Sequence, residues 1–443
     1  MPLMRRLALL VLVLALAPSA FAASPRQGPW NVVLVVLDAV RADHTTPYGY
    51  GRDTTPVLAA LARQGVVFEQ ALAQSDWTLP AFASLFTGRR PAEHGVFLGP
   101  DRLGESEKTL AGLFRERGFA TAAFSAGVLH TGHFGLDRGF DVMKGFQRPA
   151  GGMGSLDQSM PAALDWLEKN HRQPFFLVVH GGDAHYPYNC PPAHRDRFAA
   201  PGGPAVPPVS HLFLQAFNSS GDAVWRDMPL AYLQSVEAVK ASTAALAGLR
   251  AQYDGCLSYG DSQLPRLSEA LTRLGLRRDT ILVVTADHGE ELGERGGFGH
   301  FGRPLYDEVL RVPLVVLHPG LPGSAGRRVA EPVEEIDLLP TLMDAEGWPV
   351  PPGVSGRSVL PLLRGEPAAP GPGLWAHGAA RVGPKVLDLE SYRRGPWQVL
   401  RQGTRWELFD LAADPGQRRD LRGQEPERFL ELAAELMRLK VKP

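Results

Sequence analysis

Among the residues that could carry chemistry in this 443-residue chain is a threonine at the start of a short predicted helix. The segment 75–90 is typical of such a helix: Thr78 is a good N-cap, Pro80 suits the first turn, and Gly88 can adopt the left-handed conformation that ends a helix. A helix N-terminus offers free N–H groups and a positive dipole end, so a hydroxyl there would face a bound phosphate or sulfate. From this segment alone, however, a purely structural N-cap is the better interpretation of Thr78.

Acidic residues follow two predicted strands. Asp38 directly follows the apolar run Asn31–Leu37, and Asp287 and His288 closely follow the run Thr280–Thr285. Carboxylate and imidazole groups are ligands that Zn²⁺, Mn²⁺ and similar ions accept.

A third apolar run, residues 175–179, leads into His180, Asp183 and His185, and His300 lies beyond the second run, across a Gly-rich loop. Any one of these groups could be an ordinary polar residue with its own partner. Three strands that deliver ligand-type residues to the same sheet edge favour a metal site instead.

These residues must be positioned by alternating strands and helices. Four continuous apolar runs have strand length, and such runs usually mark strands buried on both faces: 31–37, 175–179, 280–285 and 312–317. Helix-like stretches lie at 55–64, 109–117, 160–168, 230–248 and 262–274. The alternation predicts an α/β fold with a doubly wound, largely parallel sheet, in which chemistry gathers at the carboxyl ends of the strands.

Stretches rich in Pro and Gly interrupt this pattern at 201–208 and 367–373. The first is interpreted as an insertion or substrate-side loop, and the second as a linker. Beyond the linker, residues 397–400 and 405–411 are typical of short antiparallel strands, followed by a helix at 425–439. We therefore expect a catalytic α/β domain over 30–365 and a C-terminal subdomain over 374–443.

The N-terminus has the pattern of a secretion signal. Two arginines precede the apolar run 7–18, and small residues follow it up to Ala22. The run is shorter than the ~20 residues of a spanning helix, so cleavage near Ala22 is favoured over a membrane anchor, which predicts a periplasmic or secreted protein. Cys190 and Cys256 could pair in such a compartment, but the sequence leaves this open.

Six motifs, in order along residues 31–422, resemble the sulfatase family of the alkaline phosphatase superfamily. They are 38–44 (DAVRADH), 78–88 (TLPAFASLFTG), 285–293 (TADHGEELG), 305–314 (LYDEVLRVPL), 335–342 (EIDLLPTL) and 406–415 (WELFDLAADP). The resemblance implies an ester hydrolase with an alkaline-phosphatase-like α/β fold. In that fold a central mixed, mostly parallel sheet is flanked by helices, and a small antiparallel subdomain lies at the C-terminus.

The departures from the family pattern are informative. Sulfatases of this family generate a formylglycine from Cys or Ser, with Pro two and Arg four residues later, whereas this chain has Thr78 and Phe82 at the first and last of these positions. Threonine cannot become that aldehyde because its Cβ already carries a methyl group, so no formylglycine is expected. The family's second opening Asp is Ala39, His288 stands where Asn or Gln is usual, and nothing matches the Gly-Lys-Trp-His segment.

These changes resemble the phosphoryl-transfer branch, such as nucleotide pyrophosphatases and phosphoethanolamine transferases. The resemblance implies a divalent ion (Zn, Mn or Ca) held by Asp38, Thr78, Asp287 and His288, with Thr78 as the nucleophile. His185 and His300 resemble substrate-binding or second-metal histidines, and Asp183 could complete a second site. Arg41 and Arg89 are candidates for supporting roles, and other histidines are expected behind the site or at the surface (His94, His130 and His133).

The expected function is that of an exported, metal-dependent hydrolase that cleaves or transfers a phosphate-type ester through a covalent intermediate on Thr78. One alternative is a true sulfatase that uses unmodified Thr78. Another is a non-catalytic binding protein, although such a chain would be expected to have lost metal ligands. The substrate would be a small-molecule, lipid or glycan ester. A net charge of −1 indicates no nucleic-acid-binding face, no membrane span is expected in the mature chain, and the oligomeric state is open.

Overall fold

The computed structural model describes residues 29–440, except 128–131, 149–152, 201–242, 296–297, 301–303, 369–370, 372 and 383–384. The predicted signal segment 1–22, the Pro-rich stretch 201–208, His130 and most of the predicted helix 230–248 lie outside the described residues.

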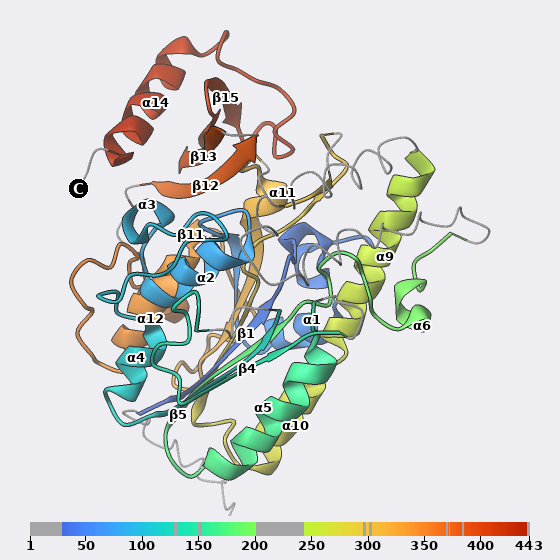
Figure 1. Ribbon diagram of the computed structural model, residues 1–443, viewed down its shortest axis with the longest axis vertical. Helices are drawn as coiled ribbons and strands as arrows, with labels where there is room; N and C mark the ends of the chain where they lie inside the picture. Colours follow the sequence, from blue (N-terminus) through green and yellow to red (C-terminus); the bar gives the residue numbers. More distant parts are fainter. Residues whose placement is uncertain are drawn as a thin grey trace, which may run out of the picture.

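A nine-stranded sheet forms the centre of the molecule (Figure 1). Its strand order is β10-β2-β9-β6-β1-β5-β3-β4, with β11 beside β2. The strands are β1 (Asn31–Leu37), β2 (Val66–Leu72), β3 (Ala120–Ala126), β4 (Val142–Phe146), β5 (Phe175–Gly181), β6 (Thr280–Thr285), β9 (Arg311–Leu317), β10 (Arg327–Val329) and β11 (Val333–Glu334). All pairs are parallel except those of β9, which runs antiparallel to both β2 and β6. The predicted mixed, mostly parallel sheet is confirmed.

The middle of the sheet is made of β6, β1 and β5, in which every residue is buried. Their Val- and Leu-rich sequences favour extended backbone and have apolar side chains for both faces, which is why the sheet can be covered by helices on each side. The predicted strand 312–317 exists as β9. Because β9 runs antiparallel, its carboxyl end lies at the edge opposite that of its neighbours and brings no ligand to them.

Helices cover both faces of the sheet (Figure 1). Helices α4 and α5 both contact β3 and β5, from opposite faces; α2 and α12 lie on the α4 side, and α1, α9 and α10 on the α5 side. The bounds are α1 (Pro56–Ala62), α2 (Thr78–Thr87), α3 (Pro91–His94), α4 (Leu110–Arg115), α5 (Leu156–Asn170), α6 (Pro192–Arg195), α9 (Thr243–Asp261), α10 (Leu264–Arg273), α11 (Asp307–Leu310), α12 (Leu338–Ala345), α13 (Leu360–Arg364), α14 (Pro426–Lys440) and the short 3-10 turns η1 (Ala42–His44), η2 (Thr46–Tyr48) and η3 (Glu335–Asp337).

The predicted helix end at Gly248 is wrong, because α9 continues to Asp261. The part of the helix beyond Gly248 is held by tertiary packing, because Leu249, Tyr253 and Leu257 are buried in the main core. Cys256 of α9 forms a disulfide with Cys190, which joins the helix to the loop after β5. The pairing that the sequence left open is therefore present.

A separate four-stranded antiparallel sheet lies near the C-terminus (Figure 1). It consists of β12 (Leu374–Val382), β13 (Lys385–Arg394), β14 (Trp397–Gln402) and β15 (Arg405–Asp410), with α14 packed on β13 and β14. The two predicted strands are β14 and β15. The backbone N–H of His377 in β12 donates to the Gln74 carbonyl at 2.8 Å, so this sheet touches the segment that leads into α2.

Candidate active site

Parallel pairing brings the ends of β1, β5 and β6 together. In the register of the sheet, Val36 lies beside both His180 and Thr285. Consequently Asp38, just after β1, meets His180 at the end of β5 and Asp287 just after β6. One ligand atom from each of these three residues lies within 4.8 Å of the other two, and all three side chains are buried.

Several polar atoms at the centre of this cluster have no hydrogen-bond partner. Both carboxylate oxygens of Asp38, Oδ2 of Asp287 and Nε2 of His180 are buried and make no hydrogen bond. Such groups are costly to bury unless a cation or hydrogen-bond donor meets them. Two carboxylates and an imidazole are also a suitable donor set for Zn²⁺ or Mn²⁺. The residues present therefore fit a divalent metal ion.

The tautomer of His180 supports the same conclusion. Ser125 Oγ donates to the Ala126 carbonyl, so it accepts from His180 Nδ1, which lies 2.9 Å away. With the proton on Nδ1, the lone pair of Nε2 faces Oδ2 of Asp38 at 3.3 Å. A lone pair and a carboxylate repel each other, so a second proton or a metal ion must lie between them. Asp38 raises the pKa of His180 despite its burial, in agreement with that requirement.

His288 extends the cluster towards α2. Its Nδ1 lies 2.9 Å from the Gly289 carbonyl, which can only accept, so Nε2 has a free lone pair in the neutral ring. That Nε2 is 3.5 Å from both Oδ1 of Asp38 and Oδ2 of Asp287. Separations of about 3.4 Å are expected between ligands that share one ion at bond lengths of about 2.1 Å in a tetrahedral arrangement.

The hydroxyl of Thr78 completes this group, since Oγ1 lies 3.3 Å from Nε2 of His288. The predicted N-cap role is wrong: Thr78 is the first residue of α2, Trp77 is the N-cap, and no side-chain capping bond is made. The hydroxyl is thus not used to cap the helix. Gly88 ends α2 with φ 65°, as the sequence predicts.

The two carboxylates differ in their electrostatics. Burial raises the pKa of Asp38, but His185, His180 and His288 together lower it to well below its ordinary value. Burial and the neighbouring Asp38 charge both raise the pKa of Asp287. Like charges this close disfavour joint ionisation, and a divalent cation would relieve that repulsion.

Two further histidines lie beside the cluster. The hairpin of β7 (Glu291–Leu292) and β8 (Phe298–Gly299) turns the chain back, so that the His300 ring lies 4.3 Å from that of His288 and 5.0 Å from that of His185. Nδ1 of His185 lies 2.5 Å from the Tyr186 carbonyl. Burial lowers the pKa of both His185 and His300, so neutral rings with a free Nε2 are expected at this position.

A buried carboxylate orients His300. Glu290 Oε1 lies 3.2 Å from Nδ1 of His300, and Tyr188 donates to Glu290 Oε2 at 2.6 Å. Burial raises the pKa of Glu290 to about 8. Glu290 and Tyr188 are not among the residues predicted from the sequence, and His180 is identified there as a ligand-type residue after the third apolar run but is not included in the predicted set of metal ligands. The available signal for His180 was a lone imidazole at the end of an otherwise apolar buried strand.

The remaining predicted residues lie around the site. Asp183 Oδ2 accepts the Leu156 N–H at 2.9 Å at the start of α5. Arg41 is buried and pairs with Asp43 and Glu294, each at 2.8 Å, and its Nη1 also donates to the Glu290 carbonyl.

Arg89 pairs with Glu107 at 2.5 Å. His94 lies behind α2, with Nε2 2.9 Å from Ser84 Oγ, whereas His133 is exposed. Thus the structure gathers Asp38, Thr78, Asp287, His288, His185 and His300, while the Asp183 carboxylate and the Arg89 guanidinium bind elsewhere.

Comparison with solved structures defines the class of fold. The chain resembles the phosphonate monoester hydrolase of Agrobacterium radiobacter with a TM-score of 0.74 and 22% identity over 93% of this chain and 95% of that one. It also resembles the protein BT4656, solved in complex with its substrate D-glucosamine-2-N,6-O-disulfate, with a TM-score of 0.73 and 20% identity over 93% and 97% of the two chains. The fold is that of the alkaline phosphatase-like hydrolases.

The family follows from the sequence match. Residues 30–347 match the Sulfatase family, and the chain belongs to this family of ester hydrolases. A curated relative, arylsulfatase K of Xenopus laevis, is 23% identical over 94% of this chain and 83% of its own length. The predicted family and the predicted ester hydrolase are confirmed. In the described part of the chain, no helix combines the length and apolar character required to cross a membrane.

Proposed function

We propose that this protein hydrolyses a phosphate-type monoester, with phosphonate monoesters included, and that Thr78 is the nucleophile. The observation that carries the proposal is the 3.3 Å contact between Thr78 Oγ1 and Nε2 of His288, beside the two unpartnered oxygens of Asp38 and the unpartnered Oδ2 of Asp287. A hydroxyl at a helix start, next to a site suited to a divalent cation, has the surroundings that activate it as a nucleophile.

Asp38, His180, Asp287 and His288 would hold the divalent ion, which when bound lowers the pKa of a nearby hydroxyl and screens the negative charge of the substrate. The identity of the ion stays between Zn, Mn and Ca. His180 is an addition to the set predicted from the sequence. His185 and His300 would contact the oxygens of the ester, and the first N–H groups of α2 would donate hydrogen bonds to the same anion.

In the first step, Thr78 Oγ1 attacks phosphorus in line and loses its proton. The new Oγ1–P bond forms as the P–O bond to the alcohol breaks, and the alcohol takes up a proton as it leaves. In the second step, water attacks the phosphothreonine, and inorganic phosphate, or the phosphonic acid, is released with Thr78 restored. An acceptor hydroxyl in place of water would give transfer rather than hydrolysis.

The chemistry of threonine is the reason to prefer phosphorus over sulfur. A sulfated formylglycine hydrate can expel sulfate as it returns to the aldehyde, whereas a sulfated threonine has no such exit. Family membership favours the second candidate, a sulfuric ester hydrolase that uses Thr78 without modification. The similarity to a phosphonate monoester hydrolase supports the first.

Export of the protein is part of the proposal. It is supported by the basic and apolar N-terminal segment of residues 1–22 and by the Cys190–Cys256 disulfide, which persists in oxidising compartments.

The test uses three esters of one alcohol: a phosphate monoester, a methylphosphonate monoester and a sulfate ester, each assayed with added Zn²⁺ or Mn²⁺. We expect turnover of the phosphorus esters, and acid quenching during turnover should trap a phosphoryl group on the peptide that contains Thr78, detected by mass spectrometry. Turnover of the sulfate ester alone would replace this proposal by the sulfatase alternative.

A further inference from the structure

Two residues beside the reaction centre have a backbone conformation that residues with side chains rarely adopt. Among the described residues, three that are not glycine have a positive φ: Ala39 at 59°, Tyr188 at 55° and Gln417 at 50°. In this left-handed region the Cβ atom crowds the following carbonyl oxygen, so such a residue persists only where its surroundings hold it. Ala39 directly follows Asp38, and Tyr188 donates to the Glu290 carboxylate. Both positions therefore require support from neighbouring elements.

Tyr253 of α9 supports the turn at Ala39. Its hydroxyl donates to the Ala39 carbonyl at 2.8 Å and accepts the N–H of Arg41 at 2.9 Å, so it bridges the two ends of the turn. The side chain is fully buried, and burial raises the pKa of the phenol well above its ordinary value, so the hydroxyl keeps its proton. The ring of Tyr253 also meets that of Tyr188 edge-on, with the ring centres 5.8 Å apart. One side chain thus contacts both strained residues.

The turn at Ala39 orients a carboxylate of the candidate metal site. The Ala39 N–H donates to Oδ1 of Asp287 at 3.3 Å, and the His288 N–H donates to the same oxygen at 3.0 Å. Because Oδ1 is occupied in this way, Oδ2 is the oxygen without a partner, and it lies 3.5 Å from Nε2 of His288. A turn that relaxed at Ala39 would move Asp38 and withdraw this N–H, so both carboxylates would lose their alignment with His180.

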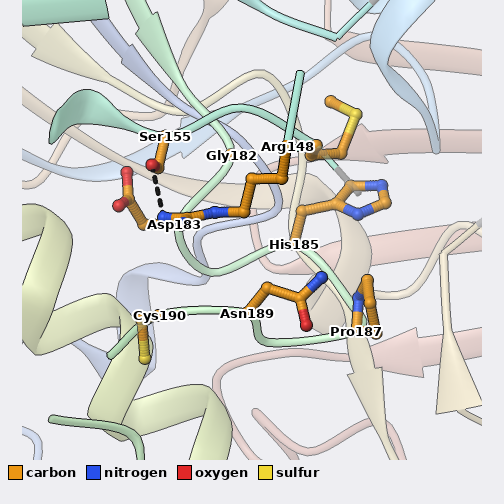
Figure 2. Close-up of a pocket in the computed structure, with 9 residues that line it drawn as sticks. Arg148, Ser155, Gly182, Asp183, His185, Pro187, Asn189 and Cys190 are labelled. Carbon is orange, nitrogen blue, oxygen red and sulfur yellow. Dashed lines mark hydrogen bonds between the residues drawn. The ribbon is translucent and has the colours of Figure 1, made fainter. Parts of the chain in front are cut away.

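Helix α9 is anchored at the point where Tyr253 acts. Cys256 lies about one helical turn beyond Tyr253 and forms a disulfide with Cys190. Figure 2 shows Cys190 at the end of the loop that also carries His185. The disulfide therefore ties α9 to the loop on one side of the site, while the Tyr253 hydroxyl ties the same part of the helix to the turn after β1.

We propose that Tyr253 is a positioning residue for the metal site: its hydroxyl holds Ala39 in the left-handed conformation and thereby sets Asp38 and Asp287 for the divalent ion. The inference rests on the proposed function, because the ion is part of it. It extends the site to α9, which carries none of the residues assigned to the ion or to the substrate.

The experiment measures, by titration calorimetry after treatment with a chelator, the affinity for whichever of Zn²⁺, Mn²⁺ and Ca²⁺ the wild type binds most tightly. Tyr253→Phe removes only the hydroxyl and should weaken binding by roughly tenfold, as for the loss of an outer-shell partner. Ala39→Gly added to this variant should recover much of the loss, because glycine adopts a positive φ without strain. Tyr259→Phe is the matched control on the same helix and should leave the affinity unchanged, since its hydroxyl donates to Asp157 of α5.

Unchanged affinity in Tyr253→Phe would overturn the inference. A loss of affinity that Ala39→Gly does not reduce would also overturn it, because the tyrosine would then act through packing alone. Melting temperatures of the metal-free variants verify that they fold. Affinity is measured without substrate, so the result stands even if the ester proves to be a sulfate. A wild type that binds none of the three ions would instead refute the metal site of the proposed function, and the inference with it.

Discussion

Thr78 Oγ1 lies 3.3 Å from Nε2 of His288, although 210 residues separate the two in sequence. Nε2 of the same imidazole is 3.5 Å from the carboxylates of both Asp38 and Asp287. A single ring thus connects the hydroxyl at the start of α2 with the acids at the ends of β1 and β6.

Removal of the hydroxyl should abolish turnover. We expect Thr78→Ala to lower kcat by roughly 10³-fold or more, since the nucleophile of a covalent mechanism is lost. Thr78→Ser should retain measurable activity because it keeps an attacking oxygen at the same position. Steady-state kinetics on the preferred ester, with circular dichroism to verify folding, provide the measurement. Full turnover by Thr78→Ala would remove Thr78 from the mechanism.

The buried acid–imidazole cluster should bind a divalent cation. After treatment with a chelator, added Zn²⁺ or Mn²⁺ should raise the melting temperature, because an ion that binds only the folded state stabilises it. We expect His180→Ala to weaken binding of the ion by roughly 100-fold or more, because the loss of an outer-shell partner alone costs roughly 10- to 100-fold, and Asp38→Asn to abolish the stabilisation. The exposed His133→Ala is the control, and titration calorimetry gives the affinity. Equal affinity in wild type and His180→Ala would exclude His180 as a ligand.

Glu290 is expected to act as a positioning residue for His300. Its Oε1 faces Nδ1 of that ring at 3.2 Å, and Tyr188 holds its other oxygen at 2.6 Å. Glu290→Leu should lower kcat by roughly 10- to 100-fold, the usual effect of losing such a supporting group, whereas Glu290→Gln, which keeps an acceptor oxygen, should recover much of that loss. If Glu290→Gln and Glu290→Leu lower kcat equally and have equal melting temperatures, Glu290 does not orient His300 through its acceptor oxygen.

The C-terminal sheet should control the segment before Thr78. A Cβ at Gly378 in β12 would lie 2.4 Å from Oδ1 of the buried Asp76. Gly378→Ala therefore has to displace Asp76, two residues before the nucleophile, and we expect kcat to fall more than stability does. Gly423→Ala is a matched control because nothing lies within 4 Å of its added Cβ. Kinetics and urea unfolding of both variants make the comparison, and wild-type kcat in Gly378→Ala would contradict the prediction.

Asp261 should make stability depend on pH. Burial raises its pKa to about 7, although the N–H groups of Val57 and Leu58 donate to it and lower the pKa in part. Because the folded pKa exceeds the unfolded one, the folded state binds more protons between about pH 4 and pH 7. The contribution of Asp261 is thus fully present below pH 4 and is lost as the pH rises towards 7, by at most about 4 kcal/mol.

Urea unfolding of wild type and Asp261→Asn at several pH values isolates this effect. The stability of wild type relative to the variant should fall from pH 4 to pH 7, since the amide does not titrate in this range. A constant difference would show that Asp261 is ionised in the folded protein throughout.

The sequence by itself determined the family, the buried strands and most of the candidate ligands. Continuous apolar runs such as Asn31–Leu37 can only be satisfied when both faces are covered, so the pattern of residue types is sufficient to predict them. Asp38, Asp287 and His288 could be proposed because parallel strands bring their carboxyl ends to one edge, a rule that requires no coordinates.

Only the tertiary structure decided which of these groups lie in contact. His180 lies against Asp38 because β5 pairs with β1. This strand order depends on contacts between residues far apart in the chain. Helix α2 begins at Thr78, one residue earlier than the sequence predicts, so the Thr78 hydroxyl does not cap the helix. The hairpin of β7 and β8 places His300 at the site. Helix α9 continues past Gly248 because tertiary packing outweighs the low helix propensity of glycine. Each of these outcomes depends on long-range packing, which local sequence patterns do not encode.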